Sequence, residues 1–334
     1  MAEQQEYPLV TFALFTYNQG KYVREAVEGA LAQNYPNLEI IISDDASTDG
    51  TWDVIRDAVS HYSGRHTVRT FRNQTNLGVV QHTLVRGREA HGDLVIMAAG
   101  DDISEPYRTT CLAAAFEADP LALAGDSLVN IVDESGVVIK RNAERPRDLA
   151  PAPLYLKNGF GAAVQGSSSA YRKCIFDVPI ELTRYEFPED ILFAFYNAVL
   201  RGRKISVNRP LVRYRMHPGA LVNHPKFSAS VSASDAAEVK SVAAARAWLQ
   251  LIEVLVEVAK ANHAESQIDM RAMCAARAHA EMVCAWRHLS VRQRCTRIVK
   301  RLGEASASDL RWMVLRALGT FPAYQPRKWM RRWA

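Results

Sequence analysis

The sequence has few cysteines, and they are not arranged for pairing or for metal binding. Five are spread over 334 residues, and no two stand at the short spacing of a zinc or redox motif. An odd, scattered set argues against a disulfide framework and is typical of a protein from a reducing compartment. The cysteines are Cys111, Cys174, Cys274, Cys284 and Cys295.

Long apolar runs are also missing. No window approaches the roughly 18–20 uninterrupted apolar residues that a membrane-spanning helix needs. The first ten residues, MAEQQEYPLV, lack the positive-then-apolar order of a secretion signal. We therefore expect a cytoplasmic protein. Its 48% hydrophobic and 23% charged residues are typical of a globular chain with a sizeable core.

The net charge of +5 is small but unevenly distributed. Arginine and lysine gather with tryptophan, methionine and leucine in the last stretch, from RQRCTRIVKRL to PRKWMRRWA. Such a mixture suits contact with an anionic membrane surface, and it equally suits a solvated helical face or an end that packs on the body. Nucleic acid is not an expected partner, because no nucleic-acid-binding module accompanies the basic residues.

The first 125 residues alternate between strand-like and helix-like patterns. Continuous apolar runs, typical of strands buried on both faces, are separated by amphipathic segments with helical spacing. The expected strands are 9–15, 38–43, 66–72 and 93–100, and the expected helices are 21–33, 51–62 and 79–90. This alternation predicts an α/β fold, a mainly parallel, Rossmann-like sheet with helices on both faces.

The pattern changes after residue 125. Residues 127–140 predict a hairpin closed by Glu134-Ser135-Gly136, and a helix begins near Pro188. After Asp235 the composition strongly favours helix. The expected divisions are 1–125 and 126–229, the two halves of one domain, and a helical C-terminal module, 230–334. Its helices could form a homo-oligomer or dock on a membrane.

Polar side chains follow three of the expected strands. The first strand ends in Thr16-Tyr17-Asn18, the second in Asp44-Asp45 and the fourth in Asp101-Asp102. Parallel strands present their carboxyl ends at one edge, where ligands bind, so the two acidic pairs would repel each other there. A divalent cation, Mn²⁺ or Mg²⁺, bridging to a nucleoside diphosphate would offset that repulsion. Helix capping and Asx turns are the alternative explanations for the two pairs.

The order and spacing of these motifs resemble family 2 glycosyltransferases with the GT-A fold. The segments VTFALF…STDGT (10–51) and NLGVV…DISEP (76–106) carry most of the resemblance, and the matched pattern extends over residues 8–222. The resemblance implies a GT-A sheet and an inverting enzyme that uses a nucleotide sugar.

The resemblance also implies roles for particular residues. Tyr17 and Asp45 match positions that contact uracil. The implied donor contacts are Thr16, Tyr17, Asn18, Asp44, Asp45, Asn76, Gly78 and Asp101, and the implied metal ligands are Asp101, Asp102 and His217. Two positions depart from the family pattern: Ala99 and Gly100 precede the acidic pair where the commoner motif is Asp-X-Asp-Asp, and Thr83 stands where many relatives have a basic residue near the diphosphate.

Inverting transfer needs a base opposite the leaving group, and so from another part of the chain than the metal motif. Glu189-Asp190 begins a helix in a segment that resembles the family's Glu-Asp motif, which implies Asp190 as base and Glu189 as an acceptor-orienting carboxylate. Favourable charge at a helix N-terminus is the alternative. The stretch RYRMHP resembles the family's last motif and implies Arg213 and Arg215 at the diphosphate, with His217 either a ligand or structural. Gly166-Ser167-Ser168-Ser169 either passes close to the acceptor or is a flexible turn.

Together these features predict an inverting glycosyltransferase that moves a sugar from a UDP-type or other NDP donor to a saccharide or lipid-linked saccharide in surface polysaccharide synthesis. It would be cytoplasmic or peripheral on the inner face of the membrane. A non-catalytic nucleotide-sugar-binding scaffold is one alternative, although it would not need Asp190. A nucleotidyltransferase is another, but FTYNQGKY has one glycine where such an enzyme has a glycine-rich basic loop.

Overall fold

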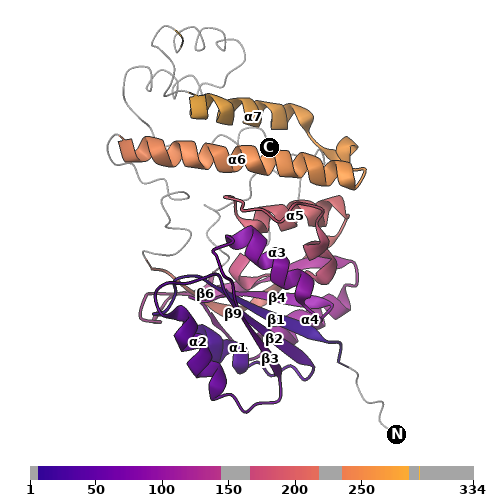
Figure 1. The fold of residues 1–334 in the computed structure, drawn as a ribbon. Coiled ribbons are helices and arrows are strands. Elements are labelled where there is room, and N and C mark those ends of the chain that lie inside the picture. The colour runs from indigo at the N-terminus through magenta and orange to yellow at the C-terminus, as the bar shows by residue number, and fades with distance from the viewer. Residues whose placement is uncertain (1–6, 144–165, 218–234, 286–292, 294–334) are drawn as a thin grey trace. The chain divides into compact units, whose positions relative to one another are not determined.

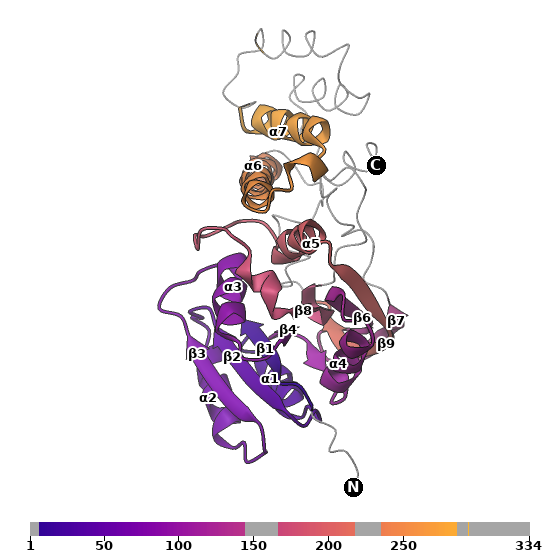
Figure 2. The same ribbon diagram turned by 90° about the vertical axis from the view of Figure 1, so that its right-hand side faces the viewer.

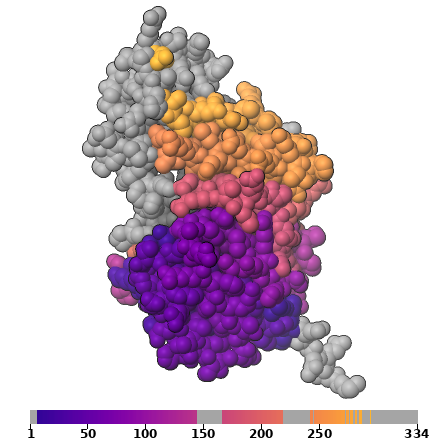
Figure 3. All heavy atoms as spheres, viewed as in Figure 1, coloured from indigo at the N-terminus to yellow at the C-terminus, as the bar shows by residue number. Residues whose placement is uncertain are grey.

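The computed structural model describes residues 7–143, 166–217, 235–285 and 293 (Figure 1). The chain divides into two compact units. Met1–Ala150 and Gly161–His217 form the first, and Pro151–Phe160 and Pro218–Ala334 form the second. In the space-filling view the indigo and violet atoms of the first half of the chain form one continuous surface (Figure 3). Every candidate site residue named above belongs to the first unit.

Within the described residues the first unit is built on a nine-stranded sheet (Figures 1 and 2). Its parallel half has the order β3 (Thr67–Arg72), β2 (Leu38–Asp44), β1 (Val10–Thr16) and β4 (Leu94–Ala99). The sheet continues through β8 (Ala170–Arg172), β6 (Ala122–Val132), β9 (Arg203–Arg215) and β5 (Ile103–Ser104), and β7 (Val138–Ala143) forms a hairpin with β6. Antiparallel pairing of β8 with β4 and β6 makes the whole sheet mixed.

Helices cover both faces of the parallel half. Phe12 and Leu14 of β1 belong to the core that includes residues of α1 (Val23–Leu31), α2 (Thr51–Ser60) and α4 (Arg108–Ala118). The chain reverses direction across the sheet after β3, so a right-handed crossover puts α3 (Val79–Glu89) on the opposite face. Both faces of β1, β2 and β4 are therefore buried, which explains why their sequences are mostly apolar. The edge strand β3 is partly exposed and more polar.

The structure confirms the α/β prediction. Each expected strand and helix of the first 125 residues is present, with ends within about two residues of the predicted ones, the usual scatter of element boundaries. The hairpin is also present, with Gly136 at φ +87° in its loop. The predicted division between residues 125 and 126 falls inside β6.

In the second unit α6 (Asp235–Ala261) packs against α7 (Met270–Ala285), in line with the helical composition. His263 ends α6 with φ 52°, and the Ala264 amide donates to the Ala259 carbonyl at 2.8 Å, a left-handed stop that satisfies a terminal carbonyl. No helix in the described ranges is long and apolar enough to cross a membrane. The basic, aromatic tail lies almost entirely outside the described residues.

Candidate active site

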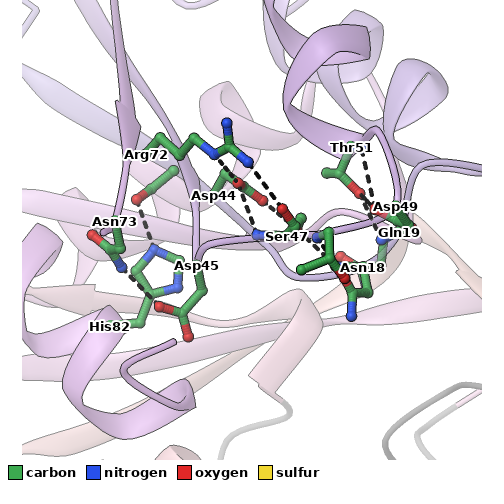
Figure 4. A network of polar contacts seen from close by, with 12 residues as sticks. Asn18, Gln19, Asp44, Asp45, Ser47, Asp49, Thr51, Arg72, Asn73 and His82 are labelled. Atoms are coloured by element: carbon green, nitrogen blue, oxygen red, sulfur yellow. Dashed lines mark hydrogen bonds and ion pairs between the residues drawn. The ribbon is translucent and has the colours of Figure 1, made fainter. Parts of the chain in front are cut away.

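The loops after β1 and β2 hold each other through hydrogen bonds at the carboxyl edge of the sheet (Figure 4). The Asn18 amide donates to Ser47 Oγ at 2.8 Å, and Asn18 Oδ1 accepts from the Thr48 amide at 2.9 Å. The Thr16 side chain is buried, with no hydrogen bond to Oγ1, whereas Tyr17 is 46% exposed. The fixed loops therefore present one free aromatic ring at the edge where the acidic pairs begin.

Asp44 faces inward and organises the turn that follows it. Its fully buried carboxylate accepts hydrogen bonds from the amide of Ser47, at 3.1 Å, and from the Ser47 hydroxyl. Arg72 Nε lies 3.5 Å from Asp44 Oδ2. Burial raises the pKa of Asp44, although the Ser47 hydrogen bonds and Arg72 oppose the rise. These are the contacts of an Asx turn, the alternative explanation for this aspartate. Contact of Asp44 with the nucleotide sugar stays a prediction.

Asp45, the next residue, points away from Asp44 toward the start of α3 (Figure 4). Its Oδ1 atom accepts from Asn73 Nδ2 at 2.8 Å and from the Leu77 amide at 2.9 Å, while Oδ2 accepts from the Gly78 amide at 2.9 Å. Gly78 has φ +78°, a conformation that favours glycine. Asn76 Oδ1 also accepts from the Gly78 amide, at 3.1 Å. The predicted residues Asn76 and Gly78 therefore shape the loop that holds Asp45.

A neutral histidine lies behind this loop. His82 on α3 is buried, and its Nε2 atom is 2.6 Å from Ser43 Oγ on β2. Burial lowers the pKa of His82 to about 4, and Asp45 only partly opposes the shift, so the ring carries no charge at pH 7. The next residue, Thr83, donates its hydroxyl to the Val79 carbonyl at 2.8 Å within the same helix, so it does not replace the basic group found in relatives.

The second acidic pair has an incomplete set of partners. Asp102 is buried, and its Oδ1 atom accepts from the Arg215 amide at 2.8 Å. Its Oδ2 atom is buried without a hydrogen bond; the Ser167 hydroxyl is close enough to lower the Asp102 pKa but makes no bond of good geometry. Burial, and then repulsion by Asp101, raise that pKa well above its usual range. Asp101 Oδ2 lies 3.0 Å from His217 Nε2.

Gly100, directly before this pair, stands where a side chain would not fit. A Cβ atom at position 100 would lie 2.7 Å from the Thr16 Cβ atom and 2.6 Å from Gln19 Oε1. The end of β4 therefore approaches the end of β1 too closely for a side chain. The first acid of the commoner motif is replaced by Ala99, whose strand position is partly buried.

The last motif anchors the second acidic pair to the rest of the fold. Arg215 is buried, and its guanidinium donates to Glu25 Oε2 at 2.8 Å, the Glu134 carbonyl at 2.8 Å and the Asp101 carbonyl at 3.0 Å. Arg213 Nε donates to Glu105 Oε1 at 2.9 Å. In this conformation both arginines are therefore committed to protein acceptors, and their contact with a diphosphate stays a prediction.

A buried arginine links the second pair to the stretch 166–169. Arg108 is fully buried and donates to Ser104 Oγ at 2.9 Å and to the carbonyls of Met97, at 2.6 Å, and Ser167, at 3.1 Å. Burial lowers the pKa of Arg108 to about 9, while Asp102 raises it, so the group is charged at pH 7. The stretch begins with a 3₁₀ turn, Gly166–Ser168, which Arg108 holds against β4.

Glu189 and Asp190 begin α5 (Glu189–Val199) on the other side of that turn. A Cβ atom on Gly166 would lie 3.1 Å from Glu189 Oε1 and 4.0 Å from the Asp190 Cβ atom. Both carboxylates raise the pKa of buried Tyr171, after burial itself. Gly166 thus adjoins Glu189 while Ser167 adjoins Asp102, so the turn brings the predicted base and the second acidic pair into one neighbourhood. This favours the close approach over a flexible turn.

Sequence reasoning missed several residues of this neighbourhood. Asn73, Arg86, Arg108 and His82 all contact or approach a predicted site residue. Asn73 had a usable signal, since it follows β3 as the acidic pairs follow β2 and β4. Arg108, at the start of a helix, and His82, on a helical face, follow no pattern that separates them from ordinary surface or core residues.

Asp101, Asp102 and His217 are the predicted metal ligands. Within the described ranges, no group of three or more His, Cys, Asp or Glu side chains is drawn together as a metal site. The buried Oδ2 of Asp102 nevertheless lacks a donor, and carboxylate oxygens are the preferred ligands of Mg²⁺ and Mn²⁺. The residues present therefore fit a divalent cation bound at Asp102, with Asp101 and His217 beside it.

The chain is similar in sequence to known proteins. The sequence model named glycosyl transferase family 2 matches residues 11–177, half of the chain. The chain is 29% identical to EpsE of Bacillus subtilis, named as a glycosyltransferase, over 58% of this chain and 69% of that protein. It is 26% identical to the chondroitin synthase of Escherichia coli, over 63% of this chain and only 32% of that protein. The chain thus spans a third of one relative and about two thirds of the other.

Two solved structures share the fold. S. aureus TarS 1-349 in complex with UDP-GlcNAc superposes with a TM-score of 0.52 at 19% identity, covering 93% of this chain and 79% of that one. GalNAc-T7 with UDP, GalNAc and Mn²⁺ has a TM-score of 0.52 at 13% identity, covering 84% of this chain and 58% of that one. The mixed sheet with flanking helices is therefore a GT-A fold.

The family match includes both acidic pairs and ends before Asp190. Because the match covers half of the chain, the chain belongs to glycosyl transferase family 2, a family of glycosyltransferases.

Proposed function

We propose that this protein transfers a sugar from a UDP-sugar to a hydroxyl group of a saccharide, with inversion at the anomeric carbon and Asp190 as the base. The arrangement that carries the proposal is the Gly166–Ser168 turn, which adjoins Asp102 through Ser167 and Glu189 through Gly166. In a single displacement the base and the leaving group act on opposite sides of the anomeric carbon. A carboxylate and an acidic pair on either side of one turn suit that requirement.

In this proposal the donor lies at the carboxyl edge of β1, β2 and β4. Tyr17, exposed at that edge, stacks on the nucleobase of the donor. Asp45 accepts a hydrogen bond from an N–H group of the same nucleobase. Asp101, Asp102 and His217 would hold a divalent cation, Mn²⁺ or Mg²⁺, which would supply positive charge to offset that of the diphosphate leaving group. UDP complexes of two proteins with this fold, TarS and GalNAc-T7, support a uridine donor.

The chain's own residues supply the remaining steps. Asp190, at the first turn of α5, takes the proton of the acceptor hydroxyl as the oxygen attacks the anomeric carbon, a contribution of roughly 10²–10⁴-fold in rate. Glu189 orients the acceptor. The Arg215 amide holds Asp102 by a hydrogen bond, and Arg108 holds the adjacent Gly166–Ser168 turn by its bond to the Ser167 carbonyl. The guanidinium groups of Arg213 and Arg215 turn to the diphosphate if the donor displaces their present acceptors.

The proposed acceptor is a saccharide. Relatives named as a glycosyltransferase and a chondroitin synthase favour a growing saccharide or lipid-linked saccharide of a surface polysaccharide. The basic, aromatic tail would keep the enzyme at the inner face of an anionic membrane where such acceptors are built. Association of two copies through the C-terminal helices is compatible with this placement.

One experiment tests the function directly. The purified chain is incubated with Mn²⁺ and a panel of UDP-, GDP- and CDP-sugars, and nucleotide release is followed with and without oligosaccharide acceptors. We expect release from a UDP-sugar that accelerates with a matching acceptor. Asp190→Asn should abolish the acceptor-dependent rate and leave UDP affinity unchanged. Wild-type turnover by this variant would contradict the base assignment, and tight UDP binding without any transfer by the wild type would favour the scaffold alternative.

A further inference from the structure

The Asp45 carboxylate is held by a chain of side chains that begins at Arg86, a residue with no predicted contact to the donor. Arg86 Nη2 on α3 donates to Asn73 Oδ1 at 3.1 Å, and Asn73 Nδ2 donates to Asp45 Oδ1 at 2.8 Å. Figure 4 shows Asn73 beside Asp45 at the end of β3. The chain thus links a helix residue to the carboxylate proposed to meet the base.

The chemistry of arginine fixes the direction of this chain. A guanidinium only donates hydrogen bonds, and a carboxylate only accepts them. Asn73 must therefore present its carbonyl oxygen to Arg86 and its NH₂ group to Asp45. Without Arg86, the Asn73 oxygen loses its donor, and the hydrogen bond to Asp45 is, within the described residues, the one side-chain contact left to hold the amide in place.

Arg86 is itself held in place. Its side chain is 11% exposed and forms an ion pair with Glu89 one turn later in α3. The centre of its guanidinium lies 4.2 Å from the centroid of the Phe71 ring on β3, within the range of a cation–π contact. Its charge also reaches the interior, because it helps to lower the pKa of His82. Arg86 is therefore a fixed donor rather than a mobile surface cation.

The remaining partners of Asp45 leave it one free side. A carboxylate has about four acceptor positions. Asn73 and the Leu77 amide occupy Oδ1, and the Gly78 amide occupies one position on Oδ2. No other donor among the described residues reaches this carboxylate. The second position on Oδ2 is thus a single, oriented acceptor, complementary to one N–H group.

We propose that Arg86 is a positioning residue for base recognition: acting through Asn73, it holds Asp45 as a one-sided acceptor and so makes the site prefer a base with an imide N–H, such as uracil, over cytosine, which has an acceptor nitrogen there. The inference rests on the proposed function, since it assumes that the base of the donor lies at Asp45. It adds two residues and a reason for selectivity to that site.

The test is a double-mutant cycle read out by nucleotide selectivity. The dissociation constants of UDP and CDP are measured by calorimetry with Mn²⁺ for the wild type, Arg86→Met, Asn73→Ala and the double variant. We expect each single variant to weaken UDP binding by about threefold to tenfold, the factor of one lost hydrogen bond. CDP binding should change less, so the ratio of UDP affinity to CDP affinity (the UDP/CDP ratio) falls. The double variant should be no weaker than the worse single one, because both changes interrupt the same chain.

Arg69→Met is the matched control. The Arg69 guanidinium also lies over Phe71, at 5.1 Å, and binds a carboxylate, Glu39, at 3.1 Å, but it does not contact Asn73. This variant should lose thermal stability like Arg86→Met and keep the wild-type UDP/CDP ratio. An equal fall in the ratio for Arg69→Met, or additive losses in the double variant, would show a merely structural effect and overturn the inference.

The outcome also separates this inference from the proposed function. If the wild type binds UDP, and both Arg86→Met and Asn73→Ala bind it with the same affinity, the positioning role is overturned. The UDP-sugar proposal then still stands. No UDP binding by the wild type, with binding of another nucleotide or of none, would overturn both.

Discussion

The two acidic pairs at the carboxyl edge of the sheet are identical in sequence and opposite in environment. Asp44 and Asp45 together accept hydrogen bonds on all four carboxylate oxygens, from Ser47, Asn73 and two backbone amides. In the second pair, the Oδ2 atom of Asp102 is buried without a hydrogen bond. Every carboxylate oxygen of the first pair thus has a protein donor, whereas one oxygen of the second pair has none among the described residues.

This difference indicates what each pair can do. A carboxylate with a protein donor on each oxygen is fixed in orientation before a ligand arrives. The acceptor position that Asp45 keeps open can then discriminate an N–H group by geometry, as recognition of a nucleobase requires. A buried, under-satisfied carboxylate costs free energy unless a positive charge completes it. Arg108 lies near but donates its hydrogen bonds elsewhere. The second pair is therefore suited to a cation, and the first is not.

Asp102→Ala is the sharpest test of this contrast and should have the largest effect. Removing a direct ligand should weaken Mn²⁺ binding by more than about 100-fold, since even a residue one layer behind a ligand is worth roughly 10–100-fold. The enhancement of UDP affinity by Mn²⁺ should disappear, measured by calorimetry with and without the ion. Asp119→Ala, which removes a pair with Arg203 and an acceptor of the Leu121 amide away from the acidic pairs, is the control. Unchanged Mn²⁺ enhancement in Asp102→Ala would remove the metal role.

The placement of both pairs at one edge could be predicted from the sequence, although the contrast between them could not. Apolar runs that end abruptly in Asp44-Asp45 and Asp101-Asp102 put both pairs at the carboxyl edge, because parallel strands align their carboxyl ends. The helical spacing at 79–90 gave α3 to within about a residue. These features depend on neighbours in sequence, and local patterns record them well.

The unpredicted part depends on contacts between distant segments. Whether Asp44 or Asp45 faces inward is decided by Ser47 and by the amides of residues 77 and 78, about thirty positions away. Arg215 and Arg108 resemble exposed cations in sequence, yet both are buried because carbonyl groups of other loops surround them. Such roles follow from tertiary packing, which no spacing rule contains.

Asp45→Asn tests the fixed acceptor and should have an intermediate effect. The amide can keep its oxygen toward Asn73 and Leu77, which turns its NH₂ group toward Gly78 and the base. UDP binding should weaken by about 10–100-fold, the value of a hydrogen bond to a charged group, and CDP should lose less or gain. The UDP and CDP dissociation constants check this, with Asp57→Asn, a surface aspartate that pairs with Arg24 on neighbouring helices, as the control. A loss equal for both nucleotides would contradict recognition through one acceptor.

Asp44→Asn should have the smallest effect, confined to stability and its dependence on pH. The amide can replace both Ser47 contacts, and the long pair with half-exposed Arg72 is worth about 0–1 kcal/mol. Because burial raises the folded-state pKa of Asp44 above 3.8, the folded protein binds that proton more tightly than the unfolded chain. Its contribution is therefore greatest below the unfolded pKa and declines as pH rises through the folded value.

The wild type should accordingly gain stability relative to Asp44→Asn when the pH is lowered from 7 to 4, with a difference within about 1 kcal/mol at pH 7. Urea unfolding at several pH values measures this directly. If the wild type instead gains free energy of unfolding relative to Asp44→Asn as the pH rises toward 7, the ion pair with Arg72 outweighs the cost of burying the carboxylate. UDP affinity should stay near the wild-type value, because the carboxylate of Asp44 is fully buried within its own turn. A loss as large as that of Asp45→Asn would mean that both members of the first pair meet the base, and the division of labour between neighbouring aspartates would fail.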